Sequence, residues 1–362
     1  MKKRILFIID SLGAGGAEKV VLTLARTMIQ SGHDVTIITV DNNVEYDIDF
    51  AAHIHTLDFK KYRFEPTYHK YAKKLRNLVA KLEQEHGRFD LITSHLQKAH
   101  RLTSGAYLSK AYYVVHSTIS KSSLAGRSGL RLYFKRRRLQ KLFNNKKIIT
   151  VSEGIAIDLL DTVLVKPKSI KTIYNPVDYD TLRQKANEPN PFQNEDYIIH
   201  IGRLTPSKRH DILLQAYAKS QVSQKLLLLG DGPLKKSMQQ LATELGIKDK
   251  VIFAGFHINP YPIIKGATLS VLTSDYEGLP TVLIESLALG VPVLSTDCPS
   301  GPREILTGEL VKQLVPADDI NTLTENIKKL SQKRDLYSAL NKVALEKFKP
   351  CNACLSYLSL IQ

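Results

Sequence analysis

The segment Glu277-Gly-Leu-Pro-Thr-Val-Leu-Ile-Glu285 follows an apolar run, residues 269–273, that has the composition of a buried strand. Pro280 is placed to be the first residue of a helix, because proline lacks the N–H that a first turn leaves unbonded. Thr281 and Val282 then present amides at a helix N-terminus, which is a favourable site for a phosphate. The segment therefore predicts a strand, an anion-binding loop and a helix.

The two carboxylates of this segment are placed to contact the same ligand. Glu285 is four residues after Thr281 and shares its helix face, where a carboxylate can accept hydrogen bonds from both hydroxyls of a ribose. Glu277 lies in the loop before the helix, where it can contact sugar hydroxyls. The alternative is a helix that carries these acids by chance.

Short apolar runs alternate with helix-length amphipathic stretches along the whole chain, which is typical of parallel sheets with crossover helices. One series of runs comprises residues 5–9, 35–40, 112–115 and 148–151. A second comprises residues 198–201, 226–229, 251–253, 269–272 and 291–294, with helical stretches after Lys208, Pro233, Pro280 and Asp319. Residues 186–194, polar and proline-containing, are the expected linker.

We therefore predict an α/β fold with two Rossmann-like, doubly wound domains that face each other across a cleft. The first domain spans residues 1–185, and the second spans residues 195–340. The C-terminal helix, at about 340–362, is expected to pack back on the first domain. Ligands of such sheets bind at the carboxyl ends of the strands.

Length and composition agree with this organisation. The 362 residues suit two domains, and 43% hydrophobic and 24% charged residues are ordinary for a globular protein. The sequence contains no uninterrupted apolar stretch of about 18 residues, so it predicts no membrane span. Residues 1–10 resemble a buried strand more than a signal peptide. Three cysteines form no disulfide framework, which favours the cytoplasm. Cys351 and Cys354 form a C-x-x-C that we interpret as two positions on a helix.

The net charge of +16 is concentrated in the first half of the chain. Residues 1–180 contain 30 Lys and Arg against 17 Asp and Glu, whereas residues 181–362 contain 21 against 18. Residues 91–152 contain 13 basic residues and no acid. With Leu132, Phe134, Leu139 and Leu142 among them, these cations predict an amphipathic helix on an anionic membrane or a polyanionic acceptor. A solvated basic face with no partner is the alternative. The cations that cluster there are Lys135, Arg136, Arg137, Arg138 and Lys141.

Three further motifs lie directly after strands. Gly13-Ala-Gly-Gly-Ala-Glu18 is a glycine-rich turn that opens a helix, where a phosphate or a sugar can bind; a tight turn needed for packing alone is the alternative. Gly202 and Arg203, with Lys208, place two cations where a diphosphate leaving group would develop charge. Gly230-Asp231-Gly232 is a tight turn that can bring the backbone close to a ligand such as a base, although turn formation alone also explains it.

Together, these motifs resemble family 4 of the retaining GT-B glycosyltransferases. The resemblance rests on Glu277-x7-Glu285, the Gly-Gly-Ala-Glu turn at 15–18, Asn175-Pro-Val-Asp178, Gly202-Arg203 through Lys208, and Gly230-Asp-Gly232, in the family's order. It implies the GT-B fold, UDP-, GDP- or ADP-sugar donors, and no metal or other cofactor. It also implies that the first domain, residues 1–185, binds the acceptor and that the second, residues 195–340, binds the nucleotide sugar.

The resemblance also implies roles for individual residues. Arg203 and Lys208 would neutralise the departing diphosphate, and Glu285 would hold the ribose. Glu277 would hold the donor sugar together with the backbone after it. His116 looks like the family's active-site histidine, which hydrogen-bonds a donor sugar hydroxyl. The remaining expected donor contacts are Gly15, Gly16, Gly202, Gly230, Asp231, Gly278, Leu279, Thr281 and Val282.

The segment Cys298-Pro-Ser-Gly-Pro-Arg-Glu304 departs from the family, many members of which have a Gly-Gly pair before the proline. Variants with one glycine resemble enzymes that build lipid-linked oligosaccharides and surface polysaccharides. The resemblance therefore favours transfer of a hexose or N-acetylhexosamine, from UDP, to a lipid-linked or lipopolysaccharide acceptor. We expect the enzyme to be peripheral on the cytoplasmic face of the membrane, with no nucleic-acid partner.

Other functions fit the sequence less well. A dinucleotide-dependent oxidoreductase or epimerase is supported by Asp41 near the end of the second strand, but Glu18 replaces the third glycine of its fingerprint. The Tyr-x-x-x-Lys signature also fails, because Tyr71 is followed by Lys74. A non-enzymatic polyanion-binding protein would leave the donor motifs unexplained. Asp47-Ile-Asp49 matches a metal-binding D-x-D pattern, but nothing else in that loop suggests a metal site.

Overall fold

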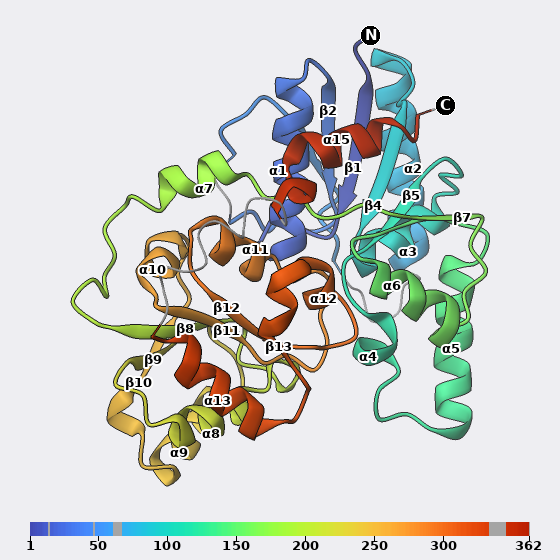
Figure 1. The fold of residues 1–362 in the computed structure, drawn as a ribbon. Helices are drawn as coiled ribbons and strands as arrows, with labels where there is room; N and C mark the ends of the chain where they lie inside the picture. Colours follow the sequence, from blue (N-terminus) through green and yellow to red (C-terminus); the bar gives the residue numbers. More distant parts are fainter. Residues whose placement is uncertain (14, 46–47, 61–66, 333–344, 362) are drawn as a thin grey trace. The chain divides into compact units, whose positions relative to one another are not determined.

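The computed structural model describes residues 1–362 except residues 14, 46–47, 61–66, 333–344 and 362. Asp47 of the D-x-D pattern lies outside the described residues. The chain forms two compact units: Met1–Pro176 with Pro350–Gln362, and Val177–Lys349. Each is a parallel α/β unit of the Rossmann type, as the sequence predicts (Figure 1).

The first unit contains a seven-stranded sheet of order β3-β2-β1-β4-β5-β6-β7, in which every neighbouring pair is parallel. Its strands are β1 (Arg4–Ile9), β2 (Asp34–Thr39), β3 (His53–Thr56), β4 (Leu91–His95), β5 (Tyr112–Val115), β6 (Lys147–Thr150) and β7 (Ser169–Thr172). Its helices are α1 (Gly16–Gln30), α2 (Thr67–His86), α3 (Gln97–Gly105), α4 (Ile119–Ser123), α5 (Gly129–Phe143), α6 (Glu153–Ile157), the π-helix η1 (Asp158–Thr162) and α15 (Pro350–Leu358).

The second unit contains a six-stranded parallel sheet of order β10-β9-β8-β11-β12-β13. Its strands are β8 (Tyr197–Ile201), β9 (Lys225–Leu229), β10 (Val251–Gly255), β11 (Leu269–Leu272), β12 (Val293–Thr296) and β13 (Leu314–Val315). Its α-helices are α7 (Tyr179–Lys185), α8 (His210–Ser220), α9 (Lys235–Glu244), α10 (Tyr261–Gly266), α11 (Thr281–Ala288), α12 (Pro302–Ile305) and α13 (Ile320–Leu330). Short 3₁₀ turns are η2 (Pro206–Lys208), η3 (Lys248–Lys250), η4 (Gly308–Gln313) and η6 (Glu346–Phe348).

Both sheets have the doubly wound order, in which the chain reverses direction across the sheet after the third strand. The reversal leaves a switch point between β1 and β4 in the first unit and between β8 and β11 in the second. Because ligands of such sheets bind beyond the carboxyl ends of the strands at the switch point, these two positions are where site residues belong.

The boundary between the units differs from the predicted linker. Helix α7 packs against α10 and α11, and the Asn190 side chain donates a hydrogen bond to the Tyr197 hydroxyl at 2.9 Å. Residues 177–194 therefore belong to the second unit. At the other end of the chain, α15 packs against α1 of the first unit, beside it in Figure 1.

The two edge strands of the first sheet lack the apolar runs that mark its central strands. Strand β3 reads His-Ile-His-Thr and β7 reads Ser-Ile-Lys-Thr, and both are largely exposed, whereas β1 is buried from Ile5 to Ile9. None of the described helices is long and apolar enough to cross a membrane. All three cysteines are free, with Cys351 exposed and Cys354 buried on α15.

Candidate functional site

The loops after β8 and β11 meet at the switch point of the second sheet. Strands β8 and β11 are hydrogen-bonded neighbours, so their carboxyl ends adjoin. The Thr273 hydroxyl donates to the Lys208 carbonyl at 2.9 Å, and the Asp275 amide donates to the Ser207 carbonyl at 2.8 Å. These bonds hold the loop that carries Lys208 against the loop that carries Glu277.

Lys208 and Glu277, 69 positions apart in the sequence, form an ion pair between these two loops. The Lys208 Nζ lies 2.5 Å from Glu277 Oε1, and the side chains are 23% and 12% exposed. The Ser274 hydroxyl donates to the same carboxylate oxygen at 2.6 Å. An ion pair so shielded from water keeps its orientation better than a surface pair does. The structure thus brings together the cation predicted for the diphosphate and the carboxylate predicted for the sugar.

Glycines allow the loops after β8 and β9 to touch backbone to backbone. A Cβ on Gly230, whose φ is +140°, would lie 2.2 Å from the Gly202 carbonyl oxygen. A Cβ on Gly232 would lie 2.4 Å from the Leu204 carbonyl oxygen. Asp231 is exposed and accepts a hydrogen bond from the Gly232 amide at 2.7 Å, which stabilises the turn. Close packing is therefore one role of these glycines, whatever ligand they contact.

Helix α11 begins one residue later than predicted. Pro280 is the N-cap, with extended backbone angles of −73° and 91°, and Thr281 is the first helical residue. No side chain among the described residues caps this end, so the amides of Thr281 and Val282 are available to an anion, whereas that of Leu283 donates to the Pro280 carbonyl. Gly278 and Leu279 are buried, Thr281 and Val282 are half-buried, and Glu285 is buried at 4% exposure.

Arg203 and Arg209 have different environments. Arg203 is exposed, and its guanidinium makes no ion pair within the described parts of the chain. Arg209, which the motifs do not single out, lies within 3.1 Å of the carboxylates of Asp211, Asp275 and Asp318. Its backbone is left-handed, with φ of 47°, a conformation that costs roughly 1–2 kcal/mol for a residue with a Cβ. Its ion pairs hold this strained corner, and Asp275 connects the corner to the loop of Glu277.

The glycine turn of the first unit already has an anionic neighbour. Gly15 is the N-cap of α1, and a Cβ there would lie 2.2 Å from Oε2 of Glu18, in the first turn of the same helix. Burial raises the pKa of the Glu18 carboxyl, and it also raises that of Asp10 nearby. An anion at Gly15 and Gly16 would therefore have to displace Glu18 or find its carboxyl protonated.

His116 lies at the carboxyl end of β5, next to a second histidine. His95 Nδ1 is 2.9 Å from His116 Nε2, and His95 Nε2 is 2.9 Å from the Thr93 hydroxyl. Burial lowers the pKa of His116 to about 3 and lowers that of His95 well below its ordinary value. His116 is therefore neutral at physiological pH and can form a hydrogen bond with a hydroxyl without carrying charge. His95 has no distinguishing signal in the sequence, because it is one residue of a buried strand.

Buried histidines make the stability of both units depend on pH. Burial lowers the pKa of His210 to about 4, and both of its ring nitrogens lack partners within the described residues. Since the unfolded chain binds protons that the folded one excludes, stability should fall as pH drops from about 6.5 towards 4, by about 1.4 kcal/mol per pH unit for each such histidine. Burial also lowers the pKa of His95, His100, His116 and His200.

We expect His210→Phe, which keeps the ring contact with His200 at 4.5 Å between centroids, to unfold with a shallower pH dependence between pH 6.5 and 4 than wild type. Urea unfolding at a series of pH values measures this. If the free energy of unfolding had the same slope against pH in the variant and in wild type, His210 would bind its proton as readily in the folded protein as in the unfolded chain.

Helix α5 carries the predicted basic cluster, but its apolar residues serve different purposes. Leu139 is buried and Leu132 and Leu142 are half-buried, so these three pack within the unit, and only Phe134 of the predicted membrane-facing set is exposed. That part of the prediction was wrong, because a helix needs an apolar face to pack on its own domain as much as to bind a membrane.

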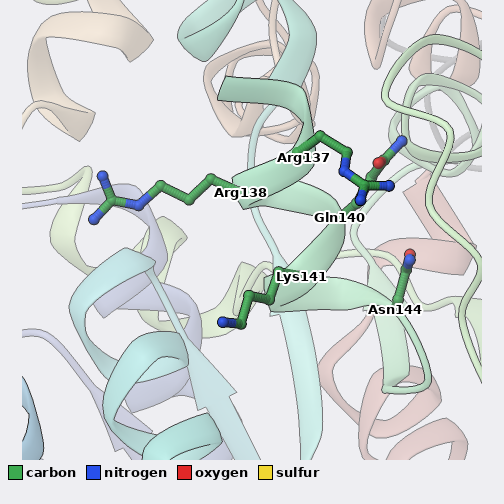
Figure 2. A pocket seen from close by; sticks show the side chains of 5 residues that line it. All are labelled: Arg137, Arg138, Gln140, Lys141 and Asn144. Atoms are coloured by element: carbon green, nitrogen blue, oxygen red, sulfur yellow. The ribbon is translucent and has the colours of Figure 1, made fainter. Parts of the chain in front are cut away.

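The cations of α5 border a hollow on the surface of the helix. Its volume is about 430 Å³, and Figure 2 shows Arg138 and Lys141 leaving the helix on one side and Arg137 and Gln140 on the other. Lys135 and Arg136 are half-buried, so they are less available to a partner. The residues that line the hollow are Arg137, Arg138, Gln140, Lys141 and Asn144.

Two family models cover most of the chain. Residues 14–181 match the family described as Glycosyltransferase Family 4, and residues 182–347 match Glycosyl transferases group 1. The N-acetylgalactosamine-N,N'-diacetylbacillosaminyl-diphospho-undecaprenol 4-alpha-N-acetylgalactosaminyltransferase of Campylobacter jejuni is 29% identical over 374 residues, covering 99% of this chain and 100% of its own. A second enzyme of that organism, the GalNAc-alpha-(1->4)-GalNAc-alpha-(1->3)-diNAcBac-PP-undecaprenol alpha-1,4-N-acetyl-D-galactosaminyltransferase, is 26% identical, covering 90% of this chain and 88% of its own.

Among solved structures, Anabaena Alr3699/HepE in complex with UDP and glucose has a TM-score of 0.76 at 20% identity, covering 99% of this chain and 98% of its own. This similarity shows the fold that the sequence predicts. The chain is therefore a glycosyltransferase with the GT-B fold, in which a Glycosyltransferase Family 4 domain precedes a Glycosyl transferases group 1 domain.

Proposed function

We propose that this protein is a retaining, metal-independent glycosyltransferase that moves an N-acetylhexosamine or hexose from a UDP-sugar to a lipid-linked oligosaccharide or lipopolysaccharide-type acceptor. The observation that carries the acceptor class is the similarity, over nearly the whole chain, to the C. jejuni enzyme named for transfer to a diphospho-undecaprenol-linked saccharide. The UDP in the Anabaena structure of the same fold supports the donor.

The donor is proposed to bind at the switch point of the second unit. Its diphosphate would lie between the first-turn amides of α11, including those of Thr281 and Val282, and the cations Arg203 and Lys208. Glu285, one turn into α11, would accept hydrogen bonds from the ribose. The backbone at Gly230 and Asp231, at the end of β9, would border the base. This arrangement uses the capless end of α11 and the loops that adjoin it.

Catalysis is then positioning and electrostatic stabilisation. The acceptor hydroxyl attacks the anomeric carbon on the face from which UDP departs, the bond from that carbon to the phosphate oxygen breaks, and the proton passes to the departing phosphate oxygen. Lys208 and Arg203 stabilise the charge that develops on the diphosphate. Glu277 holds the donor sugar and orients Lys208 through their 2.5 Å ion pair. Neutral His116 would hydrogen-bond a donor hydroxyl, and the turn at Gly15 and Gly16 would approach the diphosphate.

A panel of radiolabelled UDP- and GDP-sugars, assayed with a polyprenyl-diphosphate-linked glycan, tests the proposed function. We expect UDP release and product formation with a UDP-hexose or UDP-N-acetylhexosamine, and an α-linked product from an α-linked donor, read from its NMR coupling constant. A product of inverted configuration would contradict retention, and turnover of GDP-sugars alone would contradict the donor.

Metal independence is part of the proposed mechanism. The Lys208 ammonium and the Arg203 guanidinium would supply the positive charge that Mg²⁺ supplies to diphosphates in other enzymes. We expect the rate in EDTA to equal the rate in buffer. A strict requirement for Mn²⁺ or Mg²⁺ would return attention to Asp47 and Asp49.

The acceptor is proposed to be met at the cytoplasmic face of the membrane, where the lipid and its diphosphate are anchored. The basic residues of α5 supply the attraction, since polybasic segments bind anionic lipids at about 1 kcal/mol per cation near the surface. The cations predicted from the sequence are Lys135, Arg136, Arg137, Arg138 and Lys141, and the exposed ones among them are Arg137, Arg138 and Lys141.

A further inference from the structure

The end of β12 and the residues after it, 296–301, lie against the loop after β11 that carries Glu277. Two hydroxyls of this segment donate to backbone carbonyls of that loop. The Thr296 hydroxyl donates to the Ser274 carbonyl at 2.8 Å, and the Ser300 hydroxyl donates to the Gly278 carbonyl at 2.9 Å. Thr296 and Ser300 are each 2% exposed, so water does not readily replace either bond. Glu277 therefore lies between two fixed points of the backbone.

Close packing adds to these two hydrogen bonds. Gly301 has a φ of +94°, and a Cβ there would lie 2.4 Å from Pro280 Cδ and 2.9 Å from the Gly278 carbonyl oxygen. The Cys298 thiol donates to the Ser300 carbonyl at 3.7 Å, which holds the serine in turn. These residues belong to the segment 298–304 that departs from the family pattern. The proposed mechanism assigns no role to them.

A hydroxyl that holds a carbonyl also aims the amide of the same peptide unit. The described residues contain no cis peptide bond, and in a trans peptide the C=O and the N–H point in opposite directions. The peptide unit between Ser274 and Asp275 shows the effect. Its carbonyl accepts from Thr296, and its amide donates at 2.8 Å to the Ser207 carbonyl, in the loop after β8. Strand β11 lies between β8 and β12, so a carbonyl held on the β12 side directs its amide towards the β8 side.

The peptide unit between Gly278 and Leu279 is held on one side only. Its carbonyl accepts from Ser300 on the β12 side, and the Leu279 amide donates to none of the residues that the structure describes. Leu279 is 6% exposed, and an amide without a partner in such surroundings is unfavourable. A ligand that accepts this hydrogen would remove the cost.

We propose that Ser300 is a positioning residue for the donor, because its bond to the Gly278 carbonyl aims the Leu279 amide at a hydroxyl of the transferred sugar. This inference rests on the proposed function, in which Glu277 holds that sugar. A sugar hydroxyl can donate to a carboxylate while it accepts from an amide, so Glu277 and the Leu279 amide can share one sugar.

The position of Leu279 favours the sugar over the diphosphate as the partner of its amide. Leu279 is two residues after Glu277, whereas the amides proposed for the diphosphate begin at Thr281. Pro280 stands between them and has no N–H, so the row of amides at the start of α11 does not continue to Leu279. UDP alone, which lacks the sugar, would leave the Leu279 amide unused.

Ser300→Ala tests the proposal by separating the two parts of the donor. We expect its kcat/KM for the UDP-sugar to fall by roughly 3–10-fold, the effect of one hydrogen bond between neutral groups, while its Kd for UDP stays within about twofold of wild type. Steady-state kinetics and calorimetric titration with UDP measure the two quantities. Ser300→Thr keeps the hydroxyl and should recover most of the wild-type kcat/KM.

Ser220→Ala is the matched control. Ser220 is 3% exposed, and its hydroxyl donates to the Tyr217 carbonyl at 2.7 Å, so its loss removes a bond of the same kind from the same unit. Ser220 is the last residue of α8, at the other end of that helix from the Lys208 loop. This variant should have the kcat/KM of wild type. Thermal unfolding, recorded for each variant, shows what each substitution costs in stability.

A series of UDP-sugars in which fluorine, a weak acceptor, replaces one sugar hydroxyl at a time identifies the hydroxyl that accepts from Leu279. Replacing that hydroxyl should lower kcat/KM in wild type, and Ser300→Ala should then cause no further loss. Further loss with every member of the series would overturn the proposal.

Three other results with Ser300 variants that unfold like wild type would also overturn the proposal. They are unchanged kinetics in Ser300→Ala, equal losses of UDP affinity and UDP-sugar turnover, and equally impaired Ser300→Ala and Ser300→Thr. Each of these leaves the proposed function intact, because wild type still turns over the UDP-sugar. A wild-type protein that turns over no UDP-sugar would instead reject the proposed function.

Discussion

Replacing Lys208 with alanine is expected to lower kcat by about 10², which is the effect of removing one preorganised group that stabilises developing charge. The ammonium is held 2.5 Å from Glu277 and is 23% exposed, so water does not readily replace it. Its loss also leaves Glu277 as an uncompensated carboxylate beside a departing anion. We expect Arg203→Ala to have a similar effect and the double variant to lose more.

Steady-state kinetics with the UDP-sugar donor measure these changes. Comparing kcat with KM shows whether a variant affects turnover or donor binding. Lys225→Ala is the matched control, because Lys225 also forms an ion pair, at 2.8 Å from Glu195. Lys225 is the first residue of β9 and so lies at the opposite end of that strand from the site loops. The Lys225→Ala variant should have the kcat of wild type. A double Arg203→Ala, Lys208→Ala variant that retains activity within about tenfold of wild type would contradict the assigned role.

The sequence could predict the positions of the site loops because the sheet is parallel. An apolar run such as residues 269–272 is buried on both faces and is recognisable without a structure. The loop after such a strand must lie at the carboxyl edge of the sheet, and so Lys208 and Glu277 could be expected near one another across 69 residues. Edge strands such as β3 could not be recognised in this way, because a strand with exposed faces needs no apolar pattern.

The contacts within the site could not be predicted in the same way. The left-handed backbone of Arg209 depends on carboxylates at 211, 275 and 318, which come together only when the second unit folds. The pairing of His95 with His116 depends on the register of β4 against β5. These features come from tertiary packing, whereas the motifs of the loops come from local chemistry.

Helix α5 also combines features set by its local sequence with features set by tertiary packing. Its sequence alternates apolar and basic residues, and this pattern indicates an amphipathic helix without saying which apolar residues face the domain. Packing uses Leu139 and Phe143, and it leaves Leu130 and Phe134 outside. Which of its apolar residues are exposed therefore becomes known only once the buried side is known.

Glu277 and Glu285 should affect different kinetic constants, although only eight positions separate them. Glu277 is bonded to Lys208 and Ser274 in the loop after β11, so Glu277→Gln removes the charge that orients the ammonium. We expect kcat to fall by about 10–100-fold, which corresponds to losing one hydrogen bond to a charged group, with UDP affinity nearly unchanged.

Glu285→Ala should instead weaken UDP binding by about 10–100-fold, because the proposed ribose contact is made equally in the bound donor and the transition state. Calorimetric titration with UDP measures this, and equal affinity in the variant and wild type would remove the ribose assignment. Because Glu285 is only 4% exposed, the alanine variant also loses packing, so thermal unfolding is recorded for both variants. Glu285→Gln keeps the volume, and if it binds UDP as weakly as Glu285→Ala while unfolding like wild type, the lost affinity comes from the carboxylate and not from a disturbed core.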